Sequence, residues 1–232
     1  LYPVDVKTGE SGWQFCNLAE INGKKATSAE NFYRACRAAS IIGTLQAAYT
    51  DFPYLGATTE NITRHEALLG VSITGMMDNP DVLFDDQVQR NGAKIVKETN
   101  RLVSQLIGIR QAARTTCVKP AGSTSCILGT ASGIHPHHAK RYFRRVQANT
   151  QENPVRHFSK FNPRAVEKSV WDPNGVTEVI TFLCEVPVGA KTKNQIDALT
   201  LLESVKLTQQ NWVRYGTNKD LCAQPWLSHN VS

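Results

Sequence analysis

The chain has 232 residues, of which 41% are apolar and 20% are charged, with 26 Lys and Arg against 20 Asp and Glu. A disordered chain needs fewer apolar residues and a larger charge imbalance, so this composition excludes disorder and indicates a globular protein of one domain, or at most two. No apolar run is long enough for a transmembrane helix, and the N-terminal residues lack the basic and apolar regions of a signal peptide.

The positive charge is concentrated in one part of the sequence. Residues 111–170 contain ten Lys and Arg but only two acidic residues, a net charge of +8, whereas the other 172 residues have a net charge of −2. A local positive field of this kind attracts anions, either nucleic acid or the phosphates of a small nucleotide. A solvated basic face gives the same pattern, so charge alone leaves these alternatives open.

The N-terminal half alternates short apolar strands with helices. Residues 13–21 predict a strand, and Thr27-Ser28-Ala29-Glu30 predicts the start of a helix, with capping-box spacing, that ends near residue 51. A helical piece is expected over 64–69, a β-branched segment with a turn over 70–80, and a long helix over 85–107. The apolar positions expected to pack in the two long helices are Phe32, Ala35, Cys36, Ala39, Ile42, Leu45, Tyr49, Val88, Ile95, Thr99, Leu102 and Leu106.

The C-terminal half continues this alternation. Residues 115–118 predict a short strand, 176–186 a buried strand, and 194–215 a last helix. Long helices separated by short apolar strands indicate an α/β architecture, for which a doubly wound sheet and an α/β barrel fit equally well.

The loop over residues 119–125 follows the predicted strand and is rich in small residues. Small residues let a backbone approach a ligand closely, and the N–H groups and hydroxyls of this loop can donate to phosphate oxygens. Lys119 adds a positive charge. The loop lacks the GxxxxGK[ST] pattern of a P-loop, and a tight capped loop without a ligand is the alternative.

Three further groups of residues suggest chemistry. His135, His137 and His138 invite a metal site, but Pro136 restricts the backbone and no Cys or carboxylate lies near them in sequence. Residues 141–145 interleave aromatic and basic side chains, which suits single-stranded nucleic acid or a strand with one basic face. Among the six cysteines, Cys16 enters polar sequence and is the strongest candidate for a reactive thiol, whereas three lie in apolar runs typical of small core residues: Cys36, Cys126 and Cys184.

Four segments together carry a resemblance to a known family. They are CNLAEING (16–23), ALLGVSITGMMDNP (67–80), VKPAGSTSCILGTASGIHPHHAKRYFRRVQ (118–147) and PWLSHNVS (225–232). The chain resembles the large, catalytic chain of the ribonucleotide reductases, in its adenosylcobalamin-dependent (class II) branch. This resemblance implies a partial ten-stranded α/β barrel, with residues 1–232 forming the C-terminal part of the barrel and the finger loop and N-terminal strands lying upstream.

The resemblance also implies a reaction and its residues. Ribonucleoside di- or triphosphates would be reduced to 2′-deoxyribonucleotides for DNA synthesis by thiyl-radical chemistry, with adenosylcobalamin as cofactor. Cys16 takes the place of one redox cysteine, whose partner, like the thiyl cysteine and its glutamate, is expected upstream of residue 1. The substrate phosphates fall on Pro120, Ala121, Gly122, Ser123 and Thr124, with Ser125 adjacent and Lys119 as a source of positive charge.

The expected partners are the ribonucleotide substrate and a thioredoxin-like reductant, with no stable nucleic acid and no membrane, in the cytoplasm. The fragment itself is expected to be inactive. Two other functions compete with this one: a basic single-stranded nucleic-acid-binding module centred on residues 140–145, and a metal hydrolase that uses the histidines at 135–138.

Overall fold

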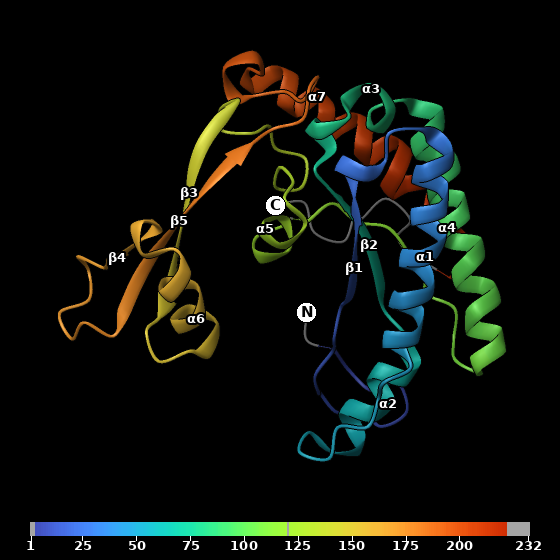
Figure 1. Ribbon diagram of the computed structural model, residues 1–232. Coiled ribbons are helices and arrows are strands. Elements are labelled where there is room, and N and C mark those ends of the chain that lie inside the picture. Colours follow the sequence, from blue (N-terminus) through green and yellow to red (C-terminus); the bar gives the residue numbers. More distant parts are fainter. Residues whose placement is uncertain (1–2, 120, 222–232) are drawn as a thin grey trace. The chain divides into compact units, whose positions relative to one another are not determined.

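The computed structural model describes residues 3–119 and 121–221. The chain divides into two compact units, of which unit 1 comprises Leu1–His137 and Pro187–Ser232 and unit 2 comprises His138–Val186 (Figure 1). None of the helices in the described ranges is long and apolar enough to cross a membrane.

Unit 1 contains a small parallel sheet and most of the helices. Its strands are β1 (Asn17–Asn22) and β2 (Leu69–Thr74). Its α-helices are α1 (Ala29–Ala47), α2 (Gly56–Glu66), α3 (Pro80–Leu83), α4 (Asp86–Ile107), α5 (Ser123–Leu128) and α7 (Ala198–Thr208). Helix α7 continues directly into a π-helix, η5 (Gln209–Val213). Short 3-10 turns cover η1 (Gly23–Lys25), η2 (Met76–Asp78), η4 (Lys193–Gln195) and η6 (Lys219–Leu221).

The sheet of unit 1 is extended by the segment that precedes the loop. Strands β1 and β2 pair in parallel, from Asn17 opposite Leu69 to Asn22 opposite Thr74. On the other side of β2, the Val71 N–H donates to the Thr115 carbonyl (2.8 Å) and the Cys117 N–H donates to the Val71 carbonyl (2.9 Å). The strand predicted over 115–118 is therefore present as a short parallel bridge to β2.

Helices α1 and α4 cover one face of this sheet (Figure 1). The core between them contains Ile21, Val71, Phe32, Val96 and Trp212. The Trp212 indole N–H lies 3.2 Å from the carbonyls of both Val71 and Cys117, which fastens η5 to the sheet. At Gly92 a Cβ would lie 2.5 Å from the Phe32 ring, so the close contact of α4 with α1 requires a glycine there.

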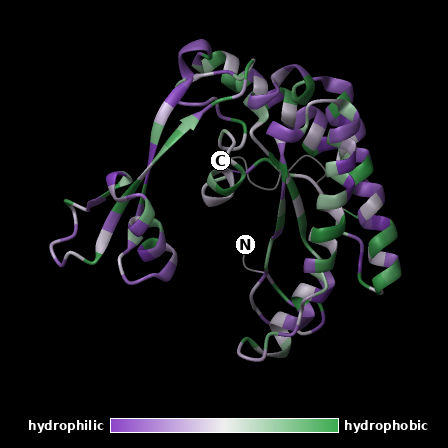
Figure 2. Ribbon diagram, in the orientation of Figure 1, coloured by the Kyte–Doolittle hydropathy of each residue, from purple (hydrophilic) through white to green (hydrophobic). Residues whose placement is uncertain are grey.

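Several apolar positions expected in the core are instead exposed. Ile42, Leu45 and Tyr49 are 62%, 52% and 72% exposed, and Leu102 and Leu106 of α4 are also exposed. Small and polar residues occupy the contact between the helices: the Ser40 hydroxyl donates to the Val96 carbonyl (2.8 Å), and the Asn100 amide donates to Thr44 Oγ1 (2.9 Å). Figure 2 shows the resulting mixture of hydrophobic and hydrophilic segments along both helices.

The helix boundaries follow the expected start signals with two differences. Ser28 caps α1 by accepting from the Asn31 N–H (3.2 Å), so the cap lies one residue after Thr27 and the Thr27–Glu30 capping box does not form. Helix α2 begins eight residues before the expected start at residue 64, and Leu69 belongs to β2. Helix α4 agrees with the prediction, because Asp85 accepts from the Val88 N–H (2.8 Å) and Gly108 ends the helix with a positive φ.

Unit 2 is a three-stranded antiparallel sheet with one helix. Its strands β3 (Arg141–Asn149), β4 (Val166–Lys168) and β5 (Thr177–Glu185) lie in the order β3-β5-β4, accompanied by α6 (Asn153–Phe161) and the 3-10 turn η3 (Pro163–Ala165). The strand expected over 176–186 is present, but the prediction that it is buried is wrong, since Ile180 is the one buried residue of β5. A sheet that packs against a single short helix leaves most of its side chains accessible.

The α/β fold class is confirmed. A ten-stranded barrel is not seen in the described residues, which form one two-stranded and one three-stranded sheet, and it stays a prediction.

Candidate active site

The sheet of unit 1 has a second face, opposite α1 and α4, that carries polar and thiol side chains. Side chains alternate between the two faces of a strand, so Leu18 and Glu20 point away from the core residue Ile21. A Cβ built at Gly70 would lie 2.7 Å from Leu18 Cδ2 and 3.0 Å from Cys117 Sγ, which places all three residues on one face. We call this the opposite face.

Cys16 stands directly before β1, in phase with Leu18 and Glu20. It is an exposed free thiol, and partial desolvation raises its pKa. Cys36 is buried as predicted, but Cys126 is exposed on α5 and Cys184 is half-buried, so the core role expected for these two is wrong for Cys126 and holds only in part for Cys184.

Cys117 is a second thiol on the opposite face that the sequence analysis did not single out. It is buried, and its pKa is raised to about 12, mainly by burial, with Cys16 and Glu20 adding to the shift and Lys119 opposing it. The sequence signal that could have identified Cys117 is its position two residues before Lys119, because alternate residues of a strand lie on the same face. The two thiols are therefore close enough to influence each other electrostatically.

Several buried polar atoms on this side of the sheet make no hydrogen bond with described residues. They are Glu20 Oε2, Asn22 Oδ1 and Ser72 Oγ, whereas Glu20 Oε1 lies against Lys119. By strand alternation these three side chains share the opposite face. Buried polar groups without partners are costly, and their occurrence together points to a polar ligand or ordered water in contact with this face.

Lys119 lies on the opposite face beside Glu20. Its Nζ is 2.6 Å from Glu20 Oε1, and the two side chains are 15% and 4% exposed. The positive charge expected to act on a phosphate is thus compensated by a carboxylate of β1.

The small residues of the loop that follows Lys119 differ in burial: some are buried and others are exposed. Ala121 is buried, whereas Gly122 and Ser123 are exposed, and the hydroxyls of Ser123 and Thr124 make no hydrogen bond with described residues. Ser125 is buried, and its hydroxyl donates to the Gly122 carbonyl (2.8 Å). The first turn of α5 has no side-chain cap, so its N–H groups remain available to an anion. Pro120 lies outside the described residues.

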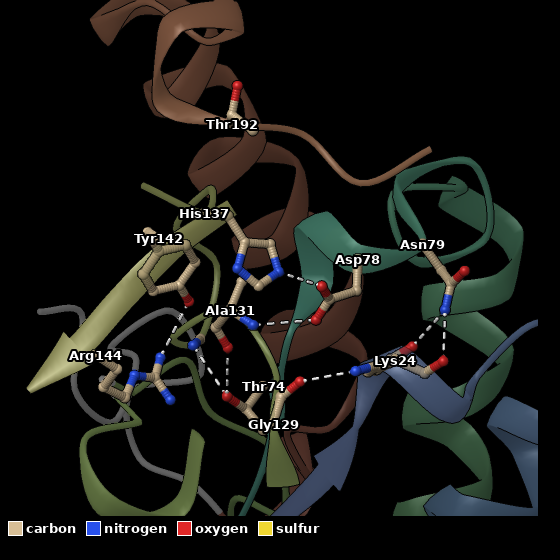
Figure 3. A network of polar contacts seen from close by, with 12 residues as sticks. Lys24, Thr74, Asp78, Asn79, Gly129, Ala131, His137, Tyr142, Arg144 and Thr192 are labelled. Carbon is tan, nitrogen blue, oxygen red and sulfur yellow. Dashed lines mark hydrogen bonds and ion pairs between the residues drawn. The ribbon is translucent and has the colours of Figure 1, made fainter. Parts of the chain in front are cut away.

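The chain after α5 is anchored to β2 and to the following turn (Figure 3). Thr74 Oγ1 donates to the Ala131 carbonyl (3.1 Å) and accepts from the Gly133 N–H (3.0 Å). Asp78 accepts from the Ala131 N–H (3.1 Å) and pairs with the buried His137. These contacts hold the loop and α5 in place from their C-terminal side.

The histidine cluster does not form a metal site in the described part of the chain. His137 is buried against Asp78, whereas His135 and His138 are exposed, and no three His, Cys, Asp or Glu side chains gather there.

The basic segment is divided between the two units. Eight of its ten basic residues lie in unit 2, which also has five acidic residues, while Arg114 and Lys119 lie in unit 1. Residues 141–145 belong to β3, where Arg141 pairs with Glu185 (2.8 Å) and Arg145 pairs with Glu167. Residues 141–145 therefore form a strand, but its basic residues do not share one face, because Arg144 alternates with Arg141 and Arg145. Part of the charge is compensated within unit 2.

Comparisons with known proteins agree with the resemblance seen in the sequence. No family model matches the chain. A probable adenosylcobalamin-dependent ribonucleoside-triphosphate reductase of Dictyostelium discoideum is 21% identical over 208 residues, which cover 86% of this chain and 26% of that protein. The crystal structure of a B12-dependent (class II) ribonucleotide reductase superposes with a TM-score of 0.65 at 15% identity, covering 86% of this chain and 32% of the other.

The chain thus spans between a quarter and a third of the length of the proteins it matches. In sequence and in fold, it resembles the adenosylcobalamin-dependent ribonucleotide reductases.

Proposed function

We propose that this chain contributes the phosphate loop and one redox cysteine to a ribonucleotide reductase. The enzyme would convert ribonucleoside di- or triphosphates to 2′-deoxyribonucleotides for DNA synthesis. The observation that supports this most directly is the opposite face, where Cys16, the unpartnered polar atoms of Glu20 and Ser72, and the strand leading to the loop lie on one side of the sheet. The match to named reductases supports the same reaction class.

Cys16 would act as one thiol of a reducing pair. Two thiols supply two hydrogen atoms, the substrate 2′-hydroxyl leaves as water, a C–H bond replaces the C–O bond, and an S–S bond forms. The raised pKa of Cys16 keeps it protonated at neutral pH, so that the thiol carries its hydrogen into this step. A thioredoxin-like protein would then reduce the disulfide by thiol exchange, for which the exposure of Cys16 gives access.

The loop would bind the substrate's phosphates. Gly122 leaves the backbone open, since a Cβ there would meet no heavy atom within 4 Å, and the free hydroxyls of Ser123 and Thr124 are donors to phosphate oxygens. Pro120 and Ala121 are proposed as members of the same loop, and Ser125 would brace it through the Gly122 carbonyl. Lys119, held by Glu20, would position the start of the loop more than it would neutralise the phosphates.

Adenosylcobalamin, when bound, would supply the radical chemistry with which such a reaction begins. Residues 1–232 would form the C-terminal part of a ten-stranded barrel. Because a dithiol reaction requires a reducing compartment, we propose the cytoplasm as the location of the enzyme.

The test uses the full-length protein with adenosylcobalamin, a ribonucleoside triphosphate and a thioredoxin system. Cys16→Ser is expected to lose about 100-fold or more of multiple turnover, because the reducing pair acts as a unit. Cys126→Ser is the matched control, since it removes an exposed thiol that is not on the sheet, and it should retain wild-type turnover. Repeated turnover by Cys16→Ser at the wild-type rate would show that Cys16 is not the reductant.

A further inference from the structure

A second concentration of positive charge lies at a recess in unit 1, away from the phosphate loop. The recess has a volume of about 640 Å³ and is formed by α4, the π-helix η5 and the residues that follow it. We call it the cationic recess, after its principal side chains: Arg90, Lys94, Lys97, Arg214, Tyr215 and Lys219.

The charge of the cationic recess is largely uncompensated. Asp220 is the one acidic residue in its lining, against five cationic side chains. Arg90 pairs with Asp86 (3.2 Å), whereas the other four cations make no ion pair with described residues. Like charges held around one concavity repel each other, and an anion bound among them removes that repulsion.

Two of the cations share an aromatic surface. The Arg90 guanidinium carbon lies 5.4 Å and the Lys94 ammonium nitrogen 5.7 Å from the centroid of the Tyr215 ring. The Arg90 guanidinium is also held by hydrogen bonds, because its Nε donates to Asn211 Oδ1 (2.7 Å) and the Asn211 amide donates to Asp86 (2.9 Å). Asn211 is 2% exposed, so the guanidinium is held by a buried group before any ligand arrives.

The π-helix is an independent observation at the same place. Residues Gln209–Val213 form a full π-turn, and two of them, Gln210 and Asn211, line the recess. π-helices are rare and occur frequently at functional sites, because the widened turn redirects side chains that a regular helix would place elsewhere. Here the widened turn provides the buried amide that holds Arg90.

We propose that the cationic recess binds a small molecule that carries two or more phosphate groups. Its volume lies in the range of ordinary ligand pockets, about 300–1,000 Å³, and fixed guanidinium and ammonium groups are the donors that phosphate oxygens prefer. The recess uses none of the residues assigned to the phosphate loop, so this proposal does not depend on the proposed reductase function.

The experiment measures binding of inorganic tripolyphosphate to the full-length protein by calorimetry at fixed low salt. The double variant Lys94→Gln/Lys97→Gln is expected to weaken binding by about 10-fold or more, because each cation contributes a charge-assisted contact. Lys206→Gln on α7 is the matched control, and the loop variant Ser123→Ala/Thr124→Ala separates this site from the phosphate loop. Lys206→Gln should bind tripolyphosphate as the wild type does, and the loop variant should keep the binding component that the Lys94→Gln/Lys97→Gln variant weakens.

A second arm replaces tripolyphosphate with ATP. Equal affinity would show that the phosphates alone are recognised, and tighter binding of ATP would add a contact to the nucleoside; both support the proposal. Equal weakening by Lys206→Gln, or no effect of the double variant, would overturn it. Tighter binding of a single-stranded oligonucleotide that competes with tripolyphosphate at the recess would also overturn it, since the partner would then be a nucleic acid.

Discussion

Lys119 Nζ and Glu20 Oε1 lie 2.6 Å apart and join the strand behind Cys16 to the start of the phosphate loop. Glu20 is four residues after Cys16, and Lys119 is the first residue of the loop over residues 119–125. Glu20 is nearly fully buried, and its second oxygen, Oε2, has no hydrogen-bond partner among the described residues. The ion pair therefore links the two parts of the proposed site while leaving carboxylate lone pairs facing the opposite face.

Breaking this pair from either side is expected to destabilise unit 1. Glu20→Gln leaves the Lys119 ammonium without its counter-charge, and Lys119→Met leaves the buried Glu20 carboxylate unpaired. Loss of one partner of a buried ion pair lowers the free energy of unfolding by about 3–5 kcal/mol. The double variant should lose less than the sum of the single losses, because it leaves no unpaired charge. Urea unfolding of the wild type, the two single variants and the double variant measures this coupling. Strictly additive losses of stability would show that the two side chains do not interact.

Variants in the loop over residues 119–125 can separate substrate binding from the stability of the fold. Ser123→Ala/Thr124→Ala removes two hydroxyls that bond to no described residue, so we expect an unchanged unfolding midpoint and a KM for substrate raised about 10-fold. Gly122→Ala should behave alike, since its Cβ enters open space that a phosphate would occupy.

Ser125→Ala is the contrasting variant in the same loop. Its buried hydroxyl donates to the Gly122 carbonyl, so this change should lower stability by about 1 kcal/mol. An unchanged KM in the Ser123/Thr124 variant would remove these hydroxyls from the phosphate site.

The buried pair of His137 and Asp78 makes a stability prediction. His137→Ala leaves the Asp78 carboxylate buried with the Ala131 N–H as its remaining donor, and we expect a loss of about 3–5 kcal/mol. His138→Ala, at the exposed neighbouring histidine, should change stability by no more than about 0.5 kcal/mol. Chemical unfolding measures both, and equal effects would mean that the pair does not anchor this segment.

Sequence patterns predicted the local elements better than the faces they bury. The start of α4 at Asp85 and its end before Gly108 follow from capping chemistry, which is local. The buried face of α1 was predicted from Ile42 and Leu45, but close helix contact at Gly92 favours small and polar residues, which hydrophobic periodicity does not weigh.

The phosphate loop and the cationic recess also differ in how far the sequence alone could predict them. The loop around Gly122 is contiguous in sequence and was predicted as a unit. The cationic recess joins Arg90 and Lys94 to Arg214 and Lys219, more than a hundred residues away, and only folding brings these charges together. Cys117 was missed because its spacing from Lys119 indicates a shared strand face but does not indicate that Cys16 lies near it in the folded sheet.

Asn100 tests the polar contact between α1 and α4. Its side chain accepts from the Ala112 N–H (3.0 Å) and donates to Thr44 (2.9 Å), so Asn100→Ala leaves buried groups unsatisfied and should cost about 1–3 kcal/mol. Asn91→Ala, the same change at an exposed position of α4, should cost less than about 0.5 kcal/mol. Equal midpoints for the two variants in urea would show that the interior polar contact does not stabilise the packing of these helices.

Cys117 predicts how stability depends on alkaline pH. Its pKa is about 12 in the folded chain against an ordinary value of 9.0, so above pH 9 the unfolded chain loses this proton while the folded chain keeps it. The free energy of unfolding should therefore fall as pH rises from 9 towards 12, by up to about 1.4 kcal/mol per pH unit from this residue. In Cys117→Ala this contribution is absent, so the variant should lose stability less steeply over that range and run parallel to the wild type below pH 8. Urea unfolding at a series of pH values gives both slopes. Identical slopes above pH 9 would show that the Cys117 thiol is not buried beside Gly70 on the opposite face.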